Sequence, residues 1–331
     1  MANSCDGNFW AITSYFNPVG YQRRLQNYRT FRQCLAVPLV TVELSFNGRF
    51  QLEHGDAEIL VQIPSADIMW QKERLLNVAL RSLPESCEKI AWVDCDIIFA
   101  NNDWAGLASK ALEKFPLLHL FHERHEVPRD SPTDELGSWD AYPTSQSVVY
   151  RMAVGEAAPE EVYVSGNPLK RRSSAGLAWA SRRDVLDEHG FYDALIVGSG
   201  DRAILCAALG ESNRFALASE MNARRAEHYL LWAKSYFNRV RGCVGYIPGH
   251  VFHLWHGDLN DRRQRERHQQ LAQFDFDPFI DISLDTSGVW RWNSDKQDLH
   301  AFVRRYFESR NEDGHPLQQA PGLDFEFVGD V

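Results

Sequence analysis

Residues 90–99, with the sequence IAWVDCDIIF, constrain the fold of this chain more than any other stretch. Apolar residues run on both sides of two acids, with no alternation of polar residues outside them. This pattern is typical of a strand that is covered on both faces, as in a mostly parallel sheet. Asp94 and Asp96 would then point to the same face, where two like charges need compensation. A divalent metal with oxygen ligands supplies it; the alternative is that both acids lie just past the exposed end of the strand and are solvated.

Composition and charge narrow the class of protein. The 331 residues are 44% hydrophobic and 24% charged, as in an ordinary soluble globular protein. The net charge of -10 argues against a partner that is nucleic acid or an anionic membrane. Ten tryptophans suggest surfaces that stack on sugars or bases, although large cores also use tryptophan. An acidic enzyme can still bind a nucleotide diphosphate if a metal supplies local positive charge.

The cysteines and the amino terminus bear on the compartment. Six cysteines are scattered without any Cys-x-x-Cys pair, so they predict neither a zinc cage nor a disulfide framework. Reduced thiols are typical of a cytosolic protein. The first residues are polar, and no apolar run has the length of a membrane span. We therefore expect a cytoplasmic protein without a membrane span.

The first third of the chain alternates strands and helices. Strands are expected at 9–16, 39–44 and 90–99, an extended segment at 50–63, and helices at 21–35 and 72–83, the latter ended by Pro84. This β-α-β-α-β order predicts a doubly wound parallel sheet.

Residues 123–172 interrupt this regular pattern. They hold many Pro, Ser, Asp and Glu residues with little periodicity, and they are too long for a plain connection. The interpretation is a functional loop, a mobile lid or a partly disordered segment. Its basic run, Lys170-Arg171-Arg172, could close over a diphosphate, but a solvated charge run is the simpler interpretation.

Regular elements return after residue 173. Helices are expected at 183–188, 202–209, 220–241, 262–272 and 297–310, with a strand-like stretch at 244–256. The last ~20 residues are expected to be loosely held. We predict one domain over 1–257 and a C-terminal extension over 258–331.

Three stretches carry a resemblance to a known family: Asp94-Cys95-Asp96, Gly198-Ser199-Gly200-Asp201, and residues 250–257, HVFHLWHG. In this order they resemble the metal-dependent glycosyltransferases of the GT-A fold, and most closely the β-1,4-galactosyltransferase type. That family has a Lys-Leu-Leu-Asn-Val helix before an Asp-Val-Asp strand, and here residues 74–78 read RLLNV. Its Gly-Gly-Glu-Asp turn holds the catalytic base, and its Met-Ile-Arg-His strand end can bind manganese. The likeness spans roughly residues 9 to 271, most of the chain.

The resemblance implies a Rossmann-like, mostly parallel sheet with helices on both faces and a helical C-terminal extension. It also implies a site for Mn²⁺ (or Mg²⁺) with ligands from Asp94, Asp96, His253 and His256. A metal would neutralise the leaving diphosphate, and an imidazole ligand favours Mn²⁺. Residues three apart face opposite ways on a regular strand, so both histidines reach one ion only if the strand ends or bends, which Gly257 permits. The alternative is that one histidine binds and the other fills a polar space.

The resemblance makes Asp201 the catalytic base, which takes a proton from an acceptor hydroxyl as that oxygen attacks the anomeric carbon. Direct attack would invert the anomeric configuration. The alternative is that Asp201 is only a helix N-cap after a glycine-rich turn. Gly200 stands where the family has Glu, and Val197 where it has an aromatic residue, so the acceptor contacts stay open.

Contacts with the nucleotide donor are expected at the carboxyl ends of the first strands, where open α/β sheets bind ligands. Arg74 and Asn77 lie one helical turn apart and could face the donor. Trp179 could stack on a sugar or pack in the core, and Glu43 could equally be a capped surface acid. The full set of expected donor contacts is Thr13, Ser14, Tyr15, Glu43, Arg74, Asn77, Asp94 and Trp179.

The sequence thus predicts a soluble, metal-dependent GT-A glycosyltransferase, inverting, with UDP-galactose or UDP-N-acetylgalactosamine as donor and a glycan or other hydroxyl as acceptor. One alternative is a nucleotidyltransferase that makes nucleotide sugars, which would carry a glycine-rich basic loop after its first strand. Residues 17–20, NPVG, are a poor version of such a loop. The other is a non-catalytic sugar-binding module, against which the presence of Asp94, Asp96 and Asp201 argues.

Overall fold

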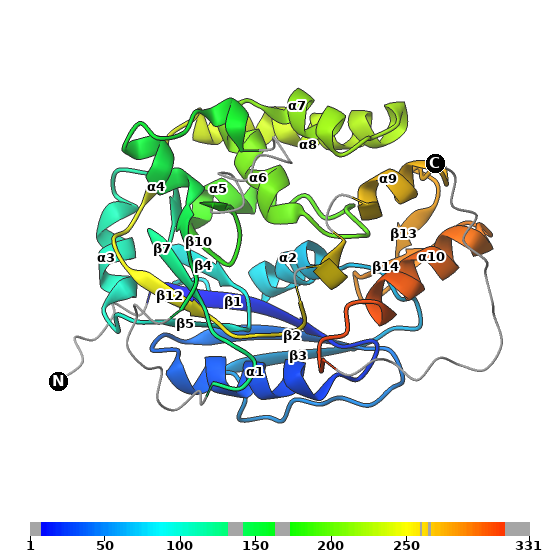
Figure 1. Cartoon of the computed structure of the whole chain (residues 1–331), viewed down its shortest axis with the longest axis horizontal. Helices are drawn as coiled ribbons and strands as arrows, with labels where there is room; N and C mark the ends of the chain where they lie inside the picture. Colours follow the sequence, from blue (N-terminus) through cyan, green and yellow to red (C-terminus); the bar gives the residue numbers. More distant parts are fainter. Residues whose placement is uncertain (1–7, 132–141, 163–172, 259, 264–265, 315–331) are drawn as a thin grey trace.

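A seven-stranded sheet forms the centre of the protein (Figure 1). The structure is a computed structural model that describes residues 8–131, 142–162, 173–258, 260–263 and 266–314. In sheet order the strands are β11 (Val244–Tyr246), β6 (Leu117–His119), β10 (Ala178–Arg182), β4 (Lys89–Val93), β1 (Phe9–Phe16), β2 (Leu39–Ser45) and β3 (Ile59–Pro64). The pairs β1–β2, β1–β4, β2–β3 and β6–β11 are parallel, and β10 is antiparallel to both its neighbours. The predicted α/β class with a mostly parallel sheet is confirmed.

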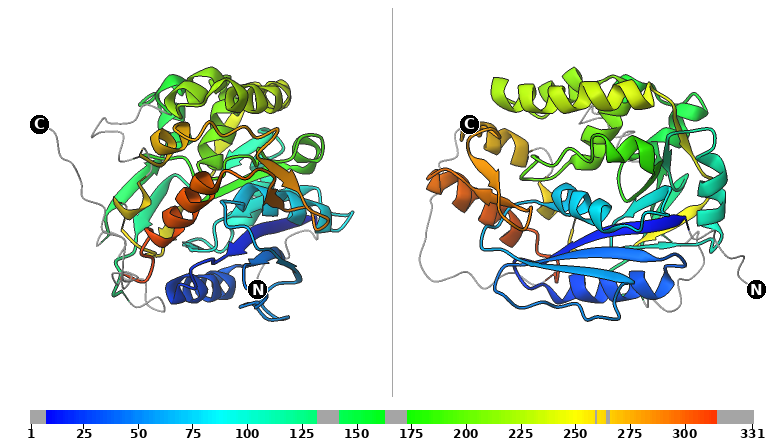
Figure 2. Two further views of the ribbon diagram at one scale, coloured as in Figure 1. Left: turned by 90° about the vertical axis from the view of Figure 1, so that its right-hand side faces the viewer. Right: turned by 180° about the vertical axis from the view of Figure 1, so that it is seen from behind.

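Helices cover both faces of this sheet (Figures 1 and 2). On one face lie α1 (Gln22–Cys34) and α3 (Trp104–Ala111); on the other lie α2 (Lys72–Ser82), α6 (Gly200–Leu209) and α8 (Ala223–Val240). Strand residues alternate between the two layers, because successive side chains point to opposite faces. Ala11 packs in the cluster that holds Tyr28 of α1, and Ile12 in the cluster that holds Leu75 of α2.

A second sheet of five strands lies beside the first. Its order is β5 (Ile97–Phe99), β12 (His250–His253), β7 (Glu123–Glu126), β8 (Thr144–Ser147) and β9 (Ser173–Ser174). The chain leaves the central sheet at Val93 and enters the second sheet at Ile97, so the prediction of one continuous strand over 90–99 was wrong. Asp94 and Asp96 lie in the turn between β4 and β5, beyond the end of β4. The physical reason is pairing, since β5 bonds to β12 and not to a strand of the central sheet.

Residues 123–172 contain more regular structure than the sequence predicted. Their described parts hold β7, β8, helix α4 (Val148–Ala153) and a 3-10 turn at Pro159–Glu161. The expectation of little regular structure was therefore wrong for these parts, whereas a functional loop or mobile lid stays a prediction. The sequence did not predict β7 and β8 because they read ERHE and TSQS, without an apolar residue in either. Residues 132–141 and 163–172, with the basic run at 170–172, lie outside the described residues.

The C-terminal segments pack on the same core as α2. They comprise η4 (Asn260–Arg262), α9 (Glu266–Ala272), the hairpin β13 (Ile282–Leu284) and β14 (Trp290–Trp292), and α10 (Gln297–Glu308). Phe307 of α10 stacks on Trp70 with ring centroids 6.2 Å apart. The remaining helices are α5 (Arg183–Asp187) and α7 (Ser212–Ala218). Within the described ranges, none of the helices has both the length and the apolar character needed to cross a membrane.

Residues 312–314, the first of the expected loose tail, are firmly held, and the rest of that tail, residues 315–331, lies outside the described residues. Glu312 is 1% exposed. Its carboxylate lies 2.9 Å from Nη1 of Arg24 and 2.5 Å from Nε of Arg310. The two guanidinium groups outweigh burial and hold the pKa of Glu312 well below its usual range. The expectation was wrong here because Arg24, far away in sequence, supplies the partner.

We expect Glu312→Ala to destabilise the protein by about 3–5 kcal/mol, because it leaves two buried guanidinium groups without their acid. Urea unfolding followed by circular dichroism measures this change. Glu308→Ala, at an exposed position of α10, is the control and should stay within about 0.5 kcal/mol of wild type. Equal effects of the two substitutions would contradict a structural role for Glu312.

Candidate active site

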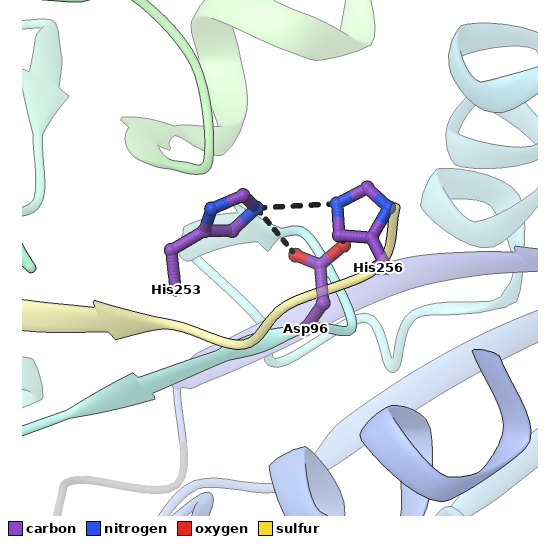
Figure 3. A group of neighbouring side chains, drawn as sticks. All are labelled: Asp96, His253 and His256. Carbon is purple, nitrogen blue, oxygen red and sulfur yellow. Dashed lines mark hydrogen bonds and ion pairs between the residues drawn. The ribbon is translucent and has the colours of Figure 1, made fainter. Parts of the chain in front are cut away.

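Asp96, His253 and His256 meet beside the turn of residues 94–96 (Figure 3). Nε2 of His256 lies 3.1 Å from Oδ2 of Asp96 and 3.2 Å from Nε2 of His253, which in turn lies 3.9 Å from Oδ1 of Asp96. β12 ends at His253, and the chain then turns toward Gly257, whose φ is +86°. The bend that the sequence required for both histidines to face one point is therefore present.

A carboxylate lies near the outer nitrogen of each histidine, but only that of His253 is hydrogen-bonded to it. Nδ1 of His253 is 2.6 Å from Oε2 of Glu126, and Nδ1 of His256 is 3.7 Å from Oε1 of Glu312. The bond to Glu126 fixes the ring of His253 so that its other nitrogen faces the ligand position, as in metal-binding histidines. Burial would raise the pKa of Glu126, but its bond to His253, with Arg124 nearby, lowers that pKa to about 2.

The charges around this group favour an ionised acid between neutral rings. Burial, with help from Arg262, lowers the pKa of His256 to about 4, so its ring is neutral at pH 7. Burial would raise the pKa of Asp96, but His256, His253 and Arg262 outweigh it and hold that pKa below its usual range. Oδ1 of Asp96 is buried and accepts no hydrogen bond from the part of the chain that the structure describes.

This donor set fits a divalent metal ion. Separations of 3.1, 3.2 and 3.9 Å between ligand atoms suit bonds of about 2.0–2.2 Å to one ion. Two imidazoles with one carboxylate favour Mn²⁺ or Zn²⁺ over Ca²⁺ and Mg²⁺. Nη2 of Arg262 is 2.9 Å from Nε2 of His256. Its guanidinium group therefore supplies positive charge next to the ionised Asp96. An ion bound here would replace it.

Asp94 is the one predicted ligand that this group does not include. Its Oδ1 is 2.5 Å from Nζ of Lys72, which also lies 2.8 Å from Oδ2 of Asp201. Burial raises the pKa of Asp94 to about 6, against the opposing effect of Lys72. Burial would lower the pKa of Lys72, but Asp201, Asp94 and Glu73 outweigh it and hold that pKa well above its usual range. Lys72 was missed in the sequence, although it begins the helix that carries Arg74 and Asn77.

Glu73 follows Lys72 in α2 and packs against Gly200 in the turn of residues 198–201. It is 2% exposed, and a Cβ placed at residue 200 would overlap its Oε1. Burial raises the pKa of Glu73 to about 8, and nearby Asp201 adds to that, so this acid carries a proton at neutral pH. Glycine at position 200 therefore makes room for an acid from α2, next to Asp201.

The 198–201 turn is held by the C-terminal segment. Gly198 and Ser199 have φ values of +88° and +86°. Oγ of Ser199 is 2.9 Å from Nε2 of His268 and accepts a bond of 2.9 Å from Nη2 of Arg267. Ser199 is the N-cap residue of α6 and Asp201 lies in the first helical turn, so the N-cap interpretation of Asp201 was wrong.

The side chains predicted at the ends of β1 and β2 bind neighbouring backbone and loops. Oγ1 of Thr13 donates to the carbonyl of Val93 over 2.6 Å, and the hydroxyl of Tyr15 donates to Oε1 of Gln51 over 2.8 Å. Ser14 is largely buried. Glu43 is buried too, and it accepts bonds from the amides of residues 51 and 52 and from Nε2 of residue 62. Its carboxylate is therefore used within the protein, and donor contact by these residues stays a prediction.

Arg74 and Asn77 both face the 191–193 segment. Nη1 of Arg74 is 3.0 Å from Oδ2 of Asp193, and Nδ2 of Asn77 donates to the same oxygen over 2.8 Å. Oδ1 of Asn77 accepts from the amide of Phe191 over 2.7 Å. These bonds position the segment that leads to the 198–201 turn. A contact with a donor again stays a prediction.

Trp179 lies in β10 within the core. It is 1% exposed, and its ring stacks on His119 with centroids 4.2 Å apart and on Trp92 at 6.3 Å. Its Nε1 donates to the carbonyl of Ala175 over 3.2 Å. The structure thus agrees with the interpretation that Trp179 packs in the core. The other interpretation, that it stacks on a sugar, stays a prediction.

No known protein family and no curated protein matches the sequence. Solved structures do match. The mannosyltransferase PcManGT of Pyrobaculum calidifontis, in complex with GDP-mannose and Mn²⁺, has 15% identity and a TM-score of 0.40 over 91% of this chain and 70% of that chain. TarS 1–349 of S. aureus, with UDP-GlcNAc, has 10% identity and a TM-score of 0.42 over 92% and 72%. The catalytic domain of Drosophila β1,4-galactosyltransferase 7, with xylobiose, has 10% identity and a TM-score of 0.34 over 89% and 98%.

Glycosyltransferases are thus among the structures that this chain is similar to, as the sequence resemblance predicted. The 4-diphosphocytidyl-2C-methyl-D-erythritol synthase of Anaerococcus prevotii also matches, with 11% identity and a TM-score of 0.30 over 74% of this chain and 90% of that chain. At such identities and scores the likeness describes the general arrangement of the chain. It says nothing of substrate, metal or reaction.

The raised pKa of Glu73 predicts a pH-dependent stability. The pKa of Glu73 in the folded protein, about 8, lies above its ordinary value of 4.5. Between pH 4.5 and pH 8 the folded state therefore keeps a proton on Glu73 that the unfolded state has released. Stability should therefore fall by on the order of a few kcal/mol as pH rises from about 5 to 8. Glu73→Gln should make this fall clearly smaller, and the raised pKa of Asp94 accounts for what is left of it.

Urea unfolding at pH 5 and pH 8 measures the effect. Glu113→Gln, at an exposed position just after α3, is the control and should keep the wild-type dependence on pH. If Glu73→Gln and wild type lose the same free energy of unfolding between the two pH values, Glu73 is already ionised in the folded protein.

Proposed function

We propose that this chain is a metal-dependent glycosyltransferase that moves a sugar from a nucleotide diphosphate donor to a hydroxyl group of a glycan. UDP-galactose and UDP-N-acetylgalactosamine are the proposed donors. The main support is the group of Asp96, His253 and His256, whose inner atoms converge while the carboxylate of Glu126 holds the outer nitrogen of His253. The group lies just past the carboxyl end of β4, where open α/β sheets bind their ligands.

The proposed roles of the metal site and of Lys72 are distinct. Asp96, His253 and His256 would hold Mn²⁺ (or Mg²⁺), and the ion would supply positive charge to the departing diphosphate. Lys72 compensates Asp94 and Asp201, which are otherwise two acids beside an incoming anion. Lys72, and not the metal, would therefore balance the charge of Asp94 when the donor binds next to it.

Asp201 is the proposed general base. Its Oδ2 accepts from Lys72, and no hydrogen bond to Oδ1 is present among the described residues. Oδ1 would take the proton of the acceptor hydroxyl while Lys72 fixes the orientation of the carboxylate. Attack by that hydroxyl on the anomeric carbon inverts its configuration. Glu73, protonated next to Asp201, would not compete for this proton.

The segment after β1 speaks against the nucleotidyltransferase alternative. Such an enzyme needs free backbone amides and basic side chains there to hold a triphosphate. Here Oδ1 of Asn17 accepts from the amides of Gly20 and Tyr21, at 3.1 and 2.9 Å. These amides are already used, and residues 17–20 contain no basic side chain.

Metal-dependent binding of the nucleotide is the direct test of this proposal. Calorimetric titration with UDP should give at least a tenfold tighter binding with Mn²⁺ than without, because the ion balances the diphosphate charge. His256→Ala should abolish the difference, while His54→Ala, in an exposed turn, should keep it. Equal affinity of the wild-type protein with and without Mn²⁺ would refute the proposal.

Asp201→Asn tests the base. The change keeps the size of the side chain and an oxygen for Lys72, so folding and UDP binding should be close to wild type. Sugar transfer should fall by roughly two to four orders of magnitude, the usual loss for a positioned base. Asp184→Asn, at an exposed site of α5, is the control. Near wild-type transfer by Asp201→Asn would exclude the proposed mechanism and leave Asp201 as a partner of Lys72 alone.

A further inference from the structure

The strands β7 and β12 carry polar side chains on both faces of the second sheet. They pair in parallel, with His250 opposite Glu123 and His253 opposite Glu126. Opposed residues of a parallel pair share a face, and positions three apart lie on opposite faces. His253 and Glu126 face the proposed active site, so His250 and Glu123 belong to the other side of the sheet.

A second group of potential metal ligands lies on this other side. His122, Glu123 and His250 each offer one ligand atom, and these atoms all lie within 4.8 Å of one another. Nδ1 of His250 is 3.4 Å from Oε2 of Glu123, and the rings of His122 and His250 meet edge to face with centroids 4.6 Å apart. All three side chains are partly exposed, so an ion can reach them from solvent.

The 3.4 Å between Nδ1 of His250 and Oε2 of Glu123 suits two ligands of one small ion. Two ligands on a tetrahedral zinc ion, with bonds of about 2.0–2.2 Å, lie roughly 3.4 Å apart. Nε2 of His125, a buried residue of β7, is 2.9 Å from Nδ1 of the same His250 and is the nearest further nitrogen. The group thus contains up to three imidazoles and one carboxylate, a set that prefers Zn²⁺ to Mg²⁺ or Ca²⁺.

Backbone contacts hold the first histidine in place. The amide of Gly249 donates to Nδ1 of His122 over 2.9 Å, and the amide of His122 donates to the carbonyl of Gly249 over 3.0 Å. Nδ1 of His122 therefore accepts the hydrogen of this amide and carries no proton of its own. Since Gly249 directly precedes β12, the ring is fixed relative to both strands.

We propose that His122, Glu123 and His250, with His125 beside them, form a second metal site that binds Zn²⁺. The ion joins β7 to β12 where both strands begin. On the opposite face the same two strands carry Glu126 and His253, so zinc stabilises the register on which the first site depends. This role is structural, and it holds whether or not the chain transfers a sugar.

The test separates the two sites by removing the first one. The protein carrying Asp96→Asn and His256→Ala is treated with EDTA, dialysed, supplied with Zn²⁺ and freed of excess metal by gel filtration. Elemental analysis should find one zinc per chain, and Zn²⁺ but not Mg²⁺ should raise the melting temperature. Adding His250→Ala should remove the bound zinc and the temperature shift, whereas adding His54→Ala should leave both.

Further measurements guard against variants that do not fold. Glu123→Gln keeps the size of the side chain. In the otherwise wild-type chain it should lower the zinc affinity of the second site at least tenfold, while the circular dichroism spectrum of the metal-free protein should not change. His250→Ala in the otherwise wild-type chain should lower the zinc content by one ion. The proposal is overturned if the Asp96→Asn/His256→Ala protein is folded and binds no zinc, or if its zinc survives His250→Ala.

Discussion

The compensation of two neighbouring carboxylates governs the arrangement of the whole site. Asp94 and Asp96 lie two residues apart in a turn that is largely covered, and neither charge can be left there alone. The protein solves this by sending them to different partners. Asp94 pairs with Lys72 of α2, and Asp96 lies beside two histidines, one at the end of β12 and one just after it. α2, which packs on the central sheet, also carries Glu73, and β12 of the second sheet also pairs with β7. Elements of both sheets are therefore arranged around this one turn.

Local patterns in the sequence predicted local structure well. The helical spacing of 72–83 and the apolar strands at 9–16 and 39–44 correspond to α2, β1 and β2. The acids and histidines that now lie together, Asp96, His253 and His256, were also named from the sequence. In each of these cases the information lies in a few neighbouring residues, or in a motif whose order along the chain is itself informative.

The rest depended on contacts between residues that are distant in the sequence. Lys72 gave no signal, since its partners lie 22 and 129 residues further along the chain. Strands β7 and β8 lack apolar residues and form because other strands pair with them. Glu312 was assigned to a loose tail because Arg24, its partner, is almost a chain length away. No periodicity in a short window records such pairings.

The 94–96 turn has a consequence for how the site would respond to its ligands. It joins the last residue of β4 in one sheet to the first residue of β5 in the other. Asp94 is therefore tied through Lys72 to Asp201, and Asp96 to the two histidines, with one residue between the two acids. Any ligand that shifts one sheet against the other alters both groups at once. Thermodynamic linkage then requires reciprocity: the factor by which a ligand at one group changes the affinity for a ligand at the other is the same in both directions.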